Sequence, residues 1–128
     1  MEYLFVYGTL LKHFNNQVMK PLQPDLQFAG TGYLKGELYD LGEYPAFVEK
    51  AAVSQTVTGE VYLIAQPEKV FTILDEYEGE EYSRKIKLVR LDTNKNIRCW
   101  VYVYRQKPSP GHTKIISGDY LAFSRNKG

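Results

Sequence analysis

The sequence predicts an α+β fold, in which a small, mainly antiparallel β-barrel of about six strands is flanked by two short helices. Segments of alternating apolar and polar residues follow one another through turns that are short enough for antiparallel pairing. Two of these segments carry internal glycines, which allow the bends that closing a small barrel requires. At 128 residues we expect a single domain, residues 1–128, with a loose C-terminal tail from about residue 122.

Six segments have the alternation that is typical of β-strands. The first, Glu2–Tyr7, places its three aromatic residues on one face and Leu4 and Val6 on the other, so we expect burial on both sides. The other strands are expected at Phe28–Leu41, Ala46–Val53, Thr56–Ala65, Tyr82–Asp92 and Ile97–Arg105, with a hairpin turn over Thr93–Asn96 between the last two.

The clearest helix covers Pro67–Glu78. Proline is tolerated in the first turn of a helix, and Gly79 occupies the usual position just past a helix end. The apolar residues recur at spacings of three and four, and the buried face is expected to consist of Val70, Phe71, Leu74 and Tyr77.

A second, shorter helix is expected near the N-terminus. Asn15 or Asn16 can cap it, and Pro21 ends it before Leu22. After Pro108 the sequence predicts an irregular tail whose last four residues are loose.

Charge and composition exclude several classes of protein. The chain has 16 basic and 15 acidic residues, a net charge of +1, and no run of Lys or Arg longer than a pair. Nucleic acids and anionic membranes attract a basic surface that this sequence does not supply, so neither partner is expected. No segment approaches the ~20 apolar residues of a membrane-spanning helix, and no secretory signal precedes the first strand, so we expect a cytoplasmic location by default.

Cysteine and histidine are too sparse for a metal or thiol site. Cys99 is the only cysteine and shares an apolar strand face with Val101 and Val103, which favours a buried, unreactive thiol. His13 and His112 are far apart in the sequence, so neither a zinc site nor a Cys–His pair is expected. No loop is rich in oxygen ligands, and we expect no metal and no cofactor.

Two features could carry chemistry. The first strand ends in a Gly8-Thr9 bend, where the backbone can approach a ligand closely and successive N–H groups can point at an anion. Glu78 lies at the border of the buried helix face, where partial burial and the negative end of the helix dipole would raise its pKa toward neutrality. Each feature has a simpler explanation, an ordinary bend and a solvated acidic cluster, and on position alone these are favoured.

Four segments together form a more specific pattern: FVYGTLLK at 5–12, GELYDLGEYPAFV at 36–48, TGEVYLI at 58–64 and LDEYEGEEYSRKIKLV at 74–89, with CWVYVY at 99–104 as weaker support. In this order they resemble the gamma-glutamylcyclotransferase-like (AIG2-like) superfamily, in particular its short bacterial-type branch related to gamma-glutamylamine cyclotransferase. The resemblance implies a β-barrel with a cavity at one mouth and Glu78 as its catalytic acid/base. It further implies that substrate is bound by Tyr7, Gly8, Thr9, Leu10, Tyr44, Pro45, Tyr82 and Arg84, and by Tyr120 with its neighbour Asp119.

The resemblance also implies a reaction, in which the α-amine of a γ-glutamyl amide attacks its own γ-carbonyl and yields 5-oxoproline and a free amine. Because the nucleophile is tethered to the carbonyl, folding the substrate can supply ~7–11 kcal/mol of the barrier reduction without a Ser or Cys nucleophile. One carboxylate can then move the proton from the attacking to the leaving nitrogen. The expected partner is a small-molecule γ-glutamyl substrate of unspecified leaving amine, bound by a monomer or weak homodimer.

Two alternatives stay open. The same fold can serve as a non-catalytic small-molecule-binding or regulatory domain, although such a domain has no need of a carboxylate at position 78. A protein-interaction domain would use exposed tyrosines and would require a contiguous apolar patch outside the cavity.

Overall fold

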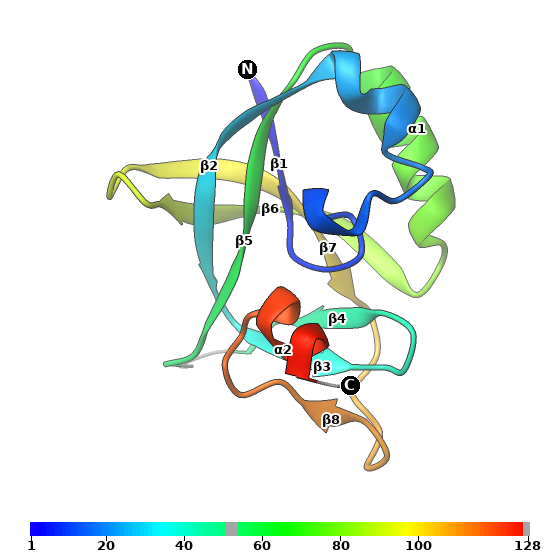
Figure 1. The fold of residues 1–128 in the computed structure, drawn as a ribbon, viewed down its shortest axis with the longest axis vertical. Helices are drawn as coiled ribbons and strands as arrows, with labels where there is room; N and C mark the ends of the chain where they lie inside the picture. Colours follow the sequence, from blue (N-terminus) through cyan, green and yellow to red (C-terminus); the bar gives the residue numbers. More distant parts are fainter. Residues whose placement is uncertain (51–53, 127–128) are drawn as a thin grey trace.

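Five strands close into a barrel in the computed structural model, which describes residues 1–50 and 54–126 (Figure 1). The order around the barrel is β1 (Glu2–Val6), β5 (Thr56–Ile64), β2 (Leu26–Lys35), β6 (Tyr82–Leu91) and β7 (Asn96–Tyr104). A parallel pairing of β7 with β1, where Leu4 lies opposite Trp100, closes the ring. The other neighbours in the barrel pair antiparallel, which confirms the predicted α+β fold with a mainly antiparallel barrel.

Three further strands extend the sheet from β7. These are β4 (Pro45–Val48), which runs parallel to β7 where Phe47 lies opposite Val103, β3 (Glu37–Asp40) and β8 (Thr113–Lys114). The predicted strand Ala46–Val53 is β4, although residues 51–53 lie outside the described part of the chain. The predicted long strand Phe28–Leu41 is in fact two strands. It ends at Gly36, whose N–H still bonds to Gln55, because the following residues leave β5 and pair with β4 instead.

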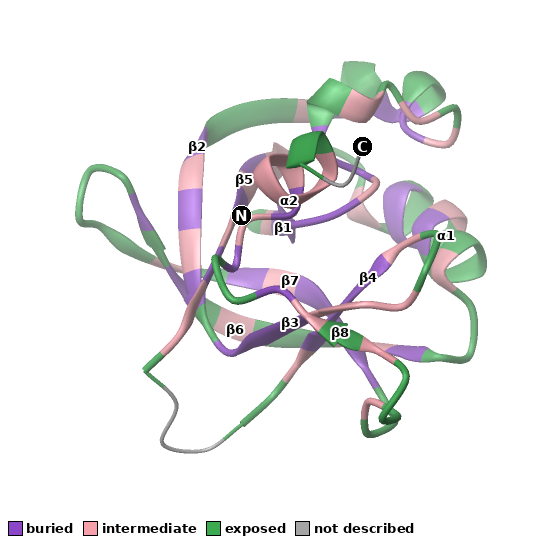
Figure 2. Ribbon diagram, turned by 60° about the horizontal axis from the view of Figure 1, so that its bottom comes forward, coloured by how far each residue is buried: buried purple, intermediate pink, exposed green. Residues whose placement is uncertain are grey.

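The two faces of β1 belong to two hydrophobic clusters, as the alternation predicts. Leu4 and Val6 face outward and belong to the cluster that contains Val70, Phe71 and Leu74 of α1 (Pro67–Glu78). Phe5 and Tyr7 belong to the cluster inside the barrel. Both sets are buried, and Figure 2 shows the buried residues of β1 and of the inward side of α1 in purple. The helix α1 therefore lies against the strand whose end forms the Gly8-Thr9 bend.

The bounds of α1 match the prediction, and one residue of its expected buried face does not. Proline stands in the first turn and Gly79 ends the helix, as expected. Tyr77, however, is 44% exposed. Its ring lies beside the loop after β1, where its hydroxyl is within hydrogen-bond distance of Thr9 and accepts from Asn16.

The predicted helix from Asn15 or Asn16 to Leu22 is wrong. The segment instead forms two 3-10 helices, Lys12–Phe14 and Lys20–Asp25, separated by a turn. The Asn16 side chain accepts the N–H of Val18 and so caps this turn, and Pro21 lies in the first turn of the second 3-10 helix. Local hydrogen bonding by asparagine therefore competes successfully with an α-helix here.

The segment after Pro108 is more ordered than the sequence predicts. It contains β8 and a helix, α2 (Tyr120–Asn126), while residues 127 and 128 lie outside the described part. The helix forms because Tyr120 is buried against Phe14, with ring centroids 5.6 Å apart, and this contact is absent from any local pattern. Among the described residues, no helix has both the length and the apolarity needed to cross a membrane.

Candidate functional site

A hollow opens where the end of β1, the C-terminal end of α1 and the start of β4 meet. Its empty space, which includes solvent at the open mouth, is about 350 Å³. We call it the Glu78 cavity; it is lined by Phe5, Val6, Tyr7, Gly8, Thr9, Leu10, Tyr44, Pro45, Glu78, Tyr82 and Tyr102.

The loop after β1 turns back on itself and leaves several N–H groups free at the cavity wall. The N–H of Leu11 donates to the Gly8 carbonyl at 3.0 Å, and the N–H of Lys12 donates to Glu60 at 2.9 Å. Within residues 1–50 and 54–126, the N–H groups of residues 8–10 make no hydrogen bond. Successive free N–H groups beside a cavity are suited to an anionic group such as a carboxylate or an oxyanion.

Glu78 contributes the only carboxylate among the lining residues. It is the last residue of α1, and Gly79 ends the helix with φ 76° and ψ −168°, a conformation that is essentially restricted to glycine. The end of α1 therefore fixes the backbone position of Glu78. The chain turns away immediately afterwards toward β6.

Burial raises the pKa of Glu78 from 4.5 to about 7. In the described part of the chain, no hydrogen bond or ion pair to its carboxylate compensates for that burial. A carboxyl group with a pKa near neutrality exists in both protonation states at neutral pH, so it can accept a proton and donate it again.

Tyr7 anchors the start of the loop. Its hydroxyl donates to the Tyr102 carbonyl at 2.6 Å and accepts the N–H of Phe47 at 3.2 Å. Burial and the nearby carboxyl of Glu78 raise the pKa of Tyr7 well above its ordinary value, so its hydroxyl stays neutral.

Tyr82 and Tyr44 form another part of the wall with Pro45. The Tyr82 hydroxyl donates to the Pro45 carbonyl at 2.9 Å, and burial raises its pKa strongly. The Tyr44 hydroxyl donates to Glu81 at 3.0 Å. The ring centroids of Tyr44 and Tyr82 lie 6.3 Å apart. Hydrogen bonds to fixed backbone and side-chain acceptors therefore hold the aromatic wall in place.

Two residues expected at the site lie elsewhere. Arg84 does not line the cavity; its guanidinium pairs with Asp75 and lies over the rings of Phe71 and Trp100. Tyr120 does not line it either, because its ring belongs to the interior cluster of the barrel. Its neighbour Asp119 accepts the N–H of Ala122 and so holds the first turn of α2.

Sequence reasoning missed two residues at the site. Tyr102 lines the cavity. It follows Trp100 by two positions on β7, so the alternation of the strand already places both aromatic residues on the same face. Asn16 holds the loop from outside: its side-chain amide donates to the Thr9 carbonyl at 3.3 Å and to the Tyr77 hydroxyl at 2.8 Å. No sequence pattern predicts this contact, because it joins three separate segments.

Other reactive side chains lie away from the cavity. Cys99 is 1% exposed inside the barrel, which confirms its predicted burial, and burial raises its pKa to about 12. His13 lies in the first 3-10 helix and His112 in the turn before β8. In the described part of the chain, no three His, Cys, Asp or Glu side chains are grouped as a metal site would require.

Known proteins are similar to this chain in sequence and in fold. A protein of Methanocaldococcus jannaschii named "Putative gamma-glutamylcyclotransferase" is 38% identical over 94% of this chain and 96% of its own length. The crystal structure of YkqA from Bacillus subtilis superposes with a TM-score of 0.78 at 25% identity, over 98% of this chain but only 42% of that chain. An AIG2-like protein of Mus musculus gives a TM-score of 0.72 at 26% identity, over 86% of this chain and 80% of that chain.

The family model described as "Gamma-glutamyl cyclotransferase, AIG2-like" matches residues 4–122. That range contains the loop after β1, the aromatic wall and the carboxylate of the Glu78 cavity. The chain therefore belongs to the AIG2-like gamma-glutamyl cyclotransferase family.

Proposed function

We propose that the protein converts a γ-glutamyl amide to 5-oxoproline and a free amine, with Glu78 as general acid/base. The observation that carries the proposal is the position of a carboxyl group with a pKa of about 7 in a cavity whose facing loop has free N–H groups. Family membership supports the reaction class, and the cavity supports the assignment of roles.

The reaction needs a folded substrate and one proton relay. After the α-ammonium of the substrate has lost a proton to water, the amine attacks the γ-carbonyl carbon, and the new C–N bond closes the five-membered ring. The Glu78 carboxylate takes a proton from the attacking nitrogen and gives it to the leaving nitrogen, whose bond to carbon then breaks. Acid/base relay of this kind contributes roughly 10²–10⁴ in rate.

The loop and the aromatic wall have separate roles in this proposal. The N–H groups of Gly8, Thr9 and Leu10 bind the substrate α-carboxylate or the oxyanion that develops on the γ-carbonyl oxygen. The neutral hydroxyls of Tyr7 and Tyr82 are already occupied by backbone groups, so they shape the cavity and exclude water rather than transfer protons.

The test is incubation with a panel of γ-glutamyl amines of different leaving groups, with detection of 5-oxoproline. We expect at least one substrate to be converted, and we expect Glu78→Gln to lower the rate by roughly 10²–10⁴. Glu76→Gln, which removes an exposed carboxylate of the same helix, is the matched control and should retain the rate. A Glu78→Gln protein with near-normal turnover overturns the acid/base role, and binding without any turnover favours a non-catalytic binding domain.

A further inference from the structure

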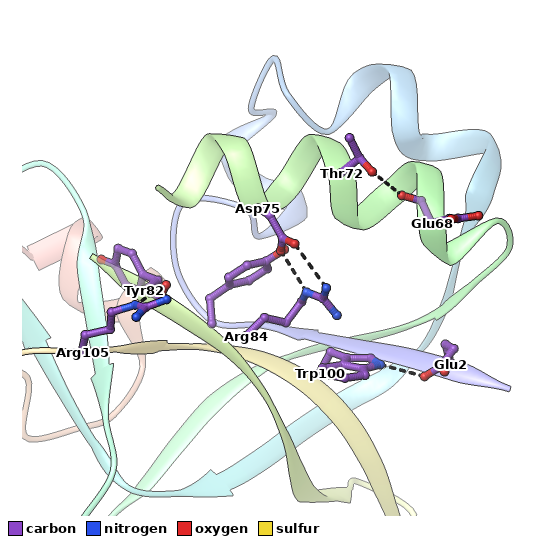
Figure 3. Close-up of polar contacts among 9 residues, drawn as sticks. Glu2, Glu68, Thr72, Asp75, Tyr82, Arg84, Trp100 and Arg105 are labelled. Atoms are coloured by element: carbon purple, nitrogen blue, oxygen red, sulfur yellow. Dashed lines mark hydrogen bonds and ion pairs between the residues drawn. The ribbon is translucent and has the colours of Figure 1, made fainter. Parts of the chain in front are cut away.

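Asp75 and Arg84 form an ion pair with two hydrogen bonds next to the Glu78 cavity. The Arg84 Nε and Nη2 groups donate to the two oxygens of Asp75 at 2.9 and 3.2 Å (Figure 3). The same guanidinium lies 3.9 Å from the ring centroid of Phe71 and 4.6 Å from that of Trp100. Two parallel hydrogen bonds and two aromatic faces fix the guanidinium more firmly than an ordinary surface ion pair.

This pair reaches the cavity through Tyr102. The Tyr102 hydroxyl donates to Asp75 Oδ1 at 2.7 Å, and the Tyr102 carbonyl accepts from the Tyr7 hydroxyl. Tyr102 lines the Glu78 cavity and also a neighbouring outer cleft, whereas Asp75 and Arg84 line the outer cleft alone. The side chain of Tyr102 therefore lies between the pair and the Glu78 cavity, and Asp75 holds its hydroxyl.

Asp75 also places a carboxylate one helical turn before Glu78 on α1. Asp75 precedes Glu78 by three residues, so the two side chains leave the helix from adjacent turns on the same side, Asp75 toward the outer cleft and Glu78 toward the cavity. Although burial raises the pKa of Asp75, hydrogen bonds from Arg84 and Tyr102 together bring it below its ordinary value. Asp75 is thus an anion whose charge is cancelled locally by Arg84.

The other ionisable groups around Glu78 do not take over this role. Those that line the cavity are four tyrosines, and their raised pKa values keep them neutral near pH 7: Tyr7, Tyr44, Tyr82 and Tyr102. Beyond the wall, Glu81 accepts from Tyr44, and Arg105 donates through Nε to the Tyr82 carbonyl (Figure 3).

We propose that Asp75 and Arg84 are positioning residues for the reaction of Glu78: Asp75 fixes Tyr102 in the cavity wall, and Arg84 cancels the charge that Asp75 places beside Glu78. The inference rests on the proposed function of Glu78 as acid/base. Neither residue contacts substrate, and their effect is transmitted through the side chain of Tyr102 and through charge.

The test titrates Glu78 directly and compares the result with the pH profile of kcat/KM. Carboxyl ¹³C NMR follows the ionisation of Glu78 without turnover, and 5-oxoproline release follows its use. Arg84→Met leaves Asp75 uncompensated and should raise the midpoint of both curves by about 1 pH unit. Asp75→Asn leaves Arg84 uncompensated and should lower both midpoints by a similar amount.

Three further variants separate charge from structure. The double variant Asp75→Asn/Arg84→Met removes both charges and should return the midpoint close to that of the unmodified protein. Arg84→Lys keeps the cation without the paired geometry and should also keep the midpoint. Tyr102→Phe should lower kcat, because the ring is no longer held by Asp75, while leaving the midpoint of Glu78 in place.

Failure of the inference and failure of the proposed function give different results. If the unmodified protein releases 5-oxoproline but the Glu78 midpoint is the same in all the charge variants, the positioning role of the pair is wrong. If the unmodified protein converts no γ-glutamyl amine, the proposed function fails and the catalytic role of the pair falls with it. Opposite shifts in the two single variants that cancel in the double variant support the inference.

Discussion

Gly8 and Pro45 approach each other so closely in the wall of the Glu78 cavity that position 8 has no room for a side chain. A Cβ atom built on Gly8 would lie 2.4 Å from Cγ and 2.9 Å from Cδ of Pro45. The absence of a side chain at position 8 is therefore a steric requirement of the cavity wall. Because Gly8 also carries one of the free N–H groups, any displacement of the loop moves a proposed substrate contact.

Gly8→Ala should therefore lower kcat/KM at least tenfold and cost about 1–3 kcal/mol of unfolding free energy, as overpacking in a filled site does. Enzyme assay and urea denaturation measure the two effects. Gly111→Ala is the control, since the nearest atom to its added Cβ is 4.0 Å away. Pro45→Ala removes both overlapping atoms and should restore much of the loss in the double variant. A Gly8→Ala protein with normal substrate affinity would show that the loop does not bind substrate.

Glu78→Gln should stabilise the protein at neutral pH. Below about pH 4.5 the carboxyl is protonated in the folded and the unfolded state, so it contributes no difference. Between there and about pH 7, the unfolded state ionises first because the folded pKa is raised, and stability falls. The full penalty of about 3 kcal/mol is present above pH 7, and glutamine does not incur it.

Urea denaturation across this pH range measures the effect. The difference between Glu78→Gln and the unmodified protein should be small near pH 4 and should grow to about 3 kcal/mol near pH 8. Glu76→Gln, on the same helix, controls for the loss of one negative charge. A difference that is independent of pH would contradict the burial of an ionisable Glu78.

Local sequence patterns predict the helices and strands whose ends and buried faces are set by neighbouring residues in the chain. The bounds of α1 follow from Pro67 and Gly79, and the two buried faces of β1 follow from its alternation. By contrast, α2 forms because Tyr120 packs against Phe14, more than a hundred positions earlier in the chain. The two-residue strand β8 likewise exists through pairing with β3. Such elements depend on contacts between distant segments, which no window of sequence contains.

The same distinction applies to the site. The four-segment resemblance brings Glu78 and the loop to one cavity, and the geometry agrees. It also assigns Arg84 to that cavity, whereas the register of β6 places Arg84 opposite Tyr102 and within reach of Asp75. A carboxylate on a neighbouring helix offers the guanidinium two hydrogen bonds and leaves it outside the cavity. Sequence spacing alone does not reveal whether Arg84 binds a ligand in the cavity or pairs with Asp75.

Gly79→Ala should separate backbone strain from steric overlap. The position has φ 76°, yet an added Cβ would find no atom within 4 Å. The substitution should therefore cost about 1–3 kcal/mol through backbone conformation alone. Since this turn sets the position of Glu78, kcat should fall more than substrate affinity does. Denaturation and steady-state kinetics check both, and an unchanged kcat would show that the helix end does not position the carboxylate.

Cys99 should be inert in the folded protein and dispensable for turnover. The thiol is 1% exposed inside the barrel and its pKa is raised to about 12, so almost no thiolate exists at neutral pH. A thiol reagent should label the protein only when urea exposes the core, and Cys99→Ala should cost about 1–2 kcal/mol of stability while leaving kcat unchanged. Because the proposed reaction uses the substrate's own amine as nucleophile, a folded Cys99→Ala protein that had lost activity would contradict that chemistry directly.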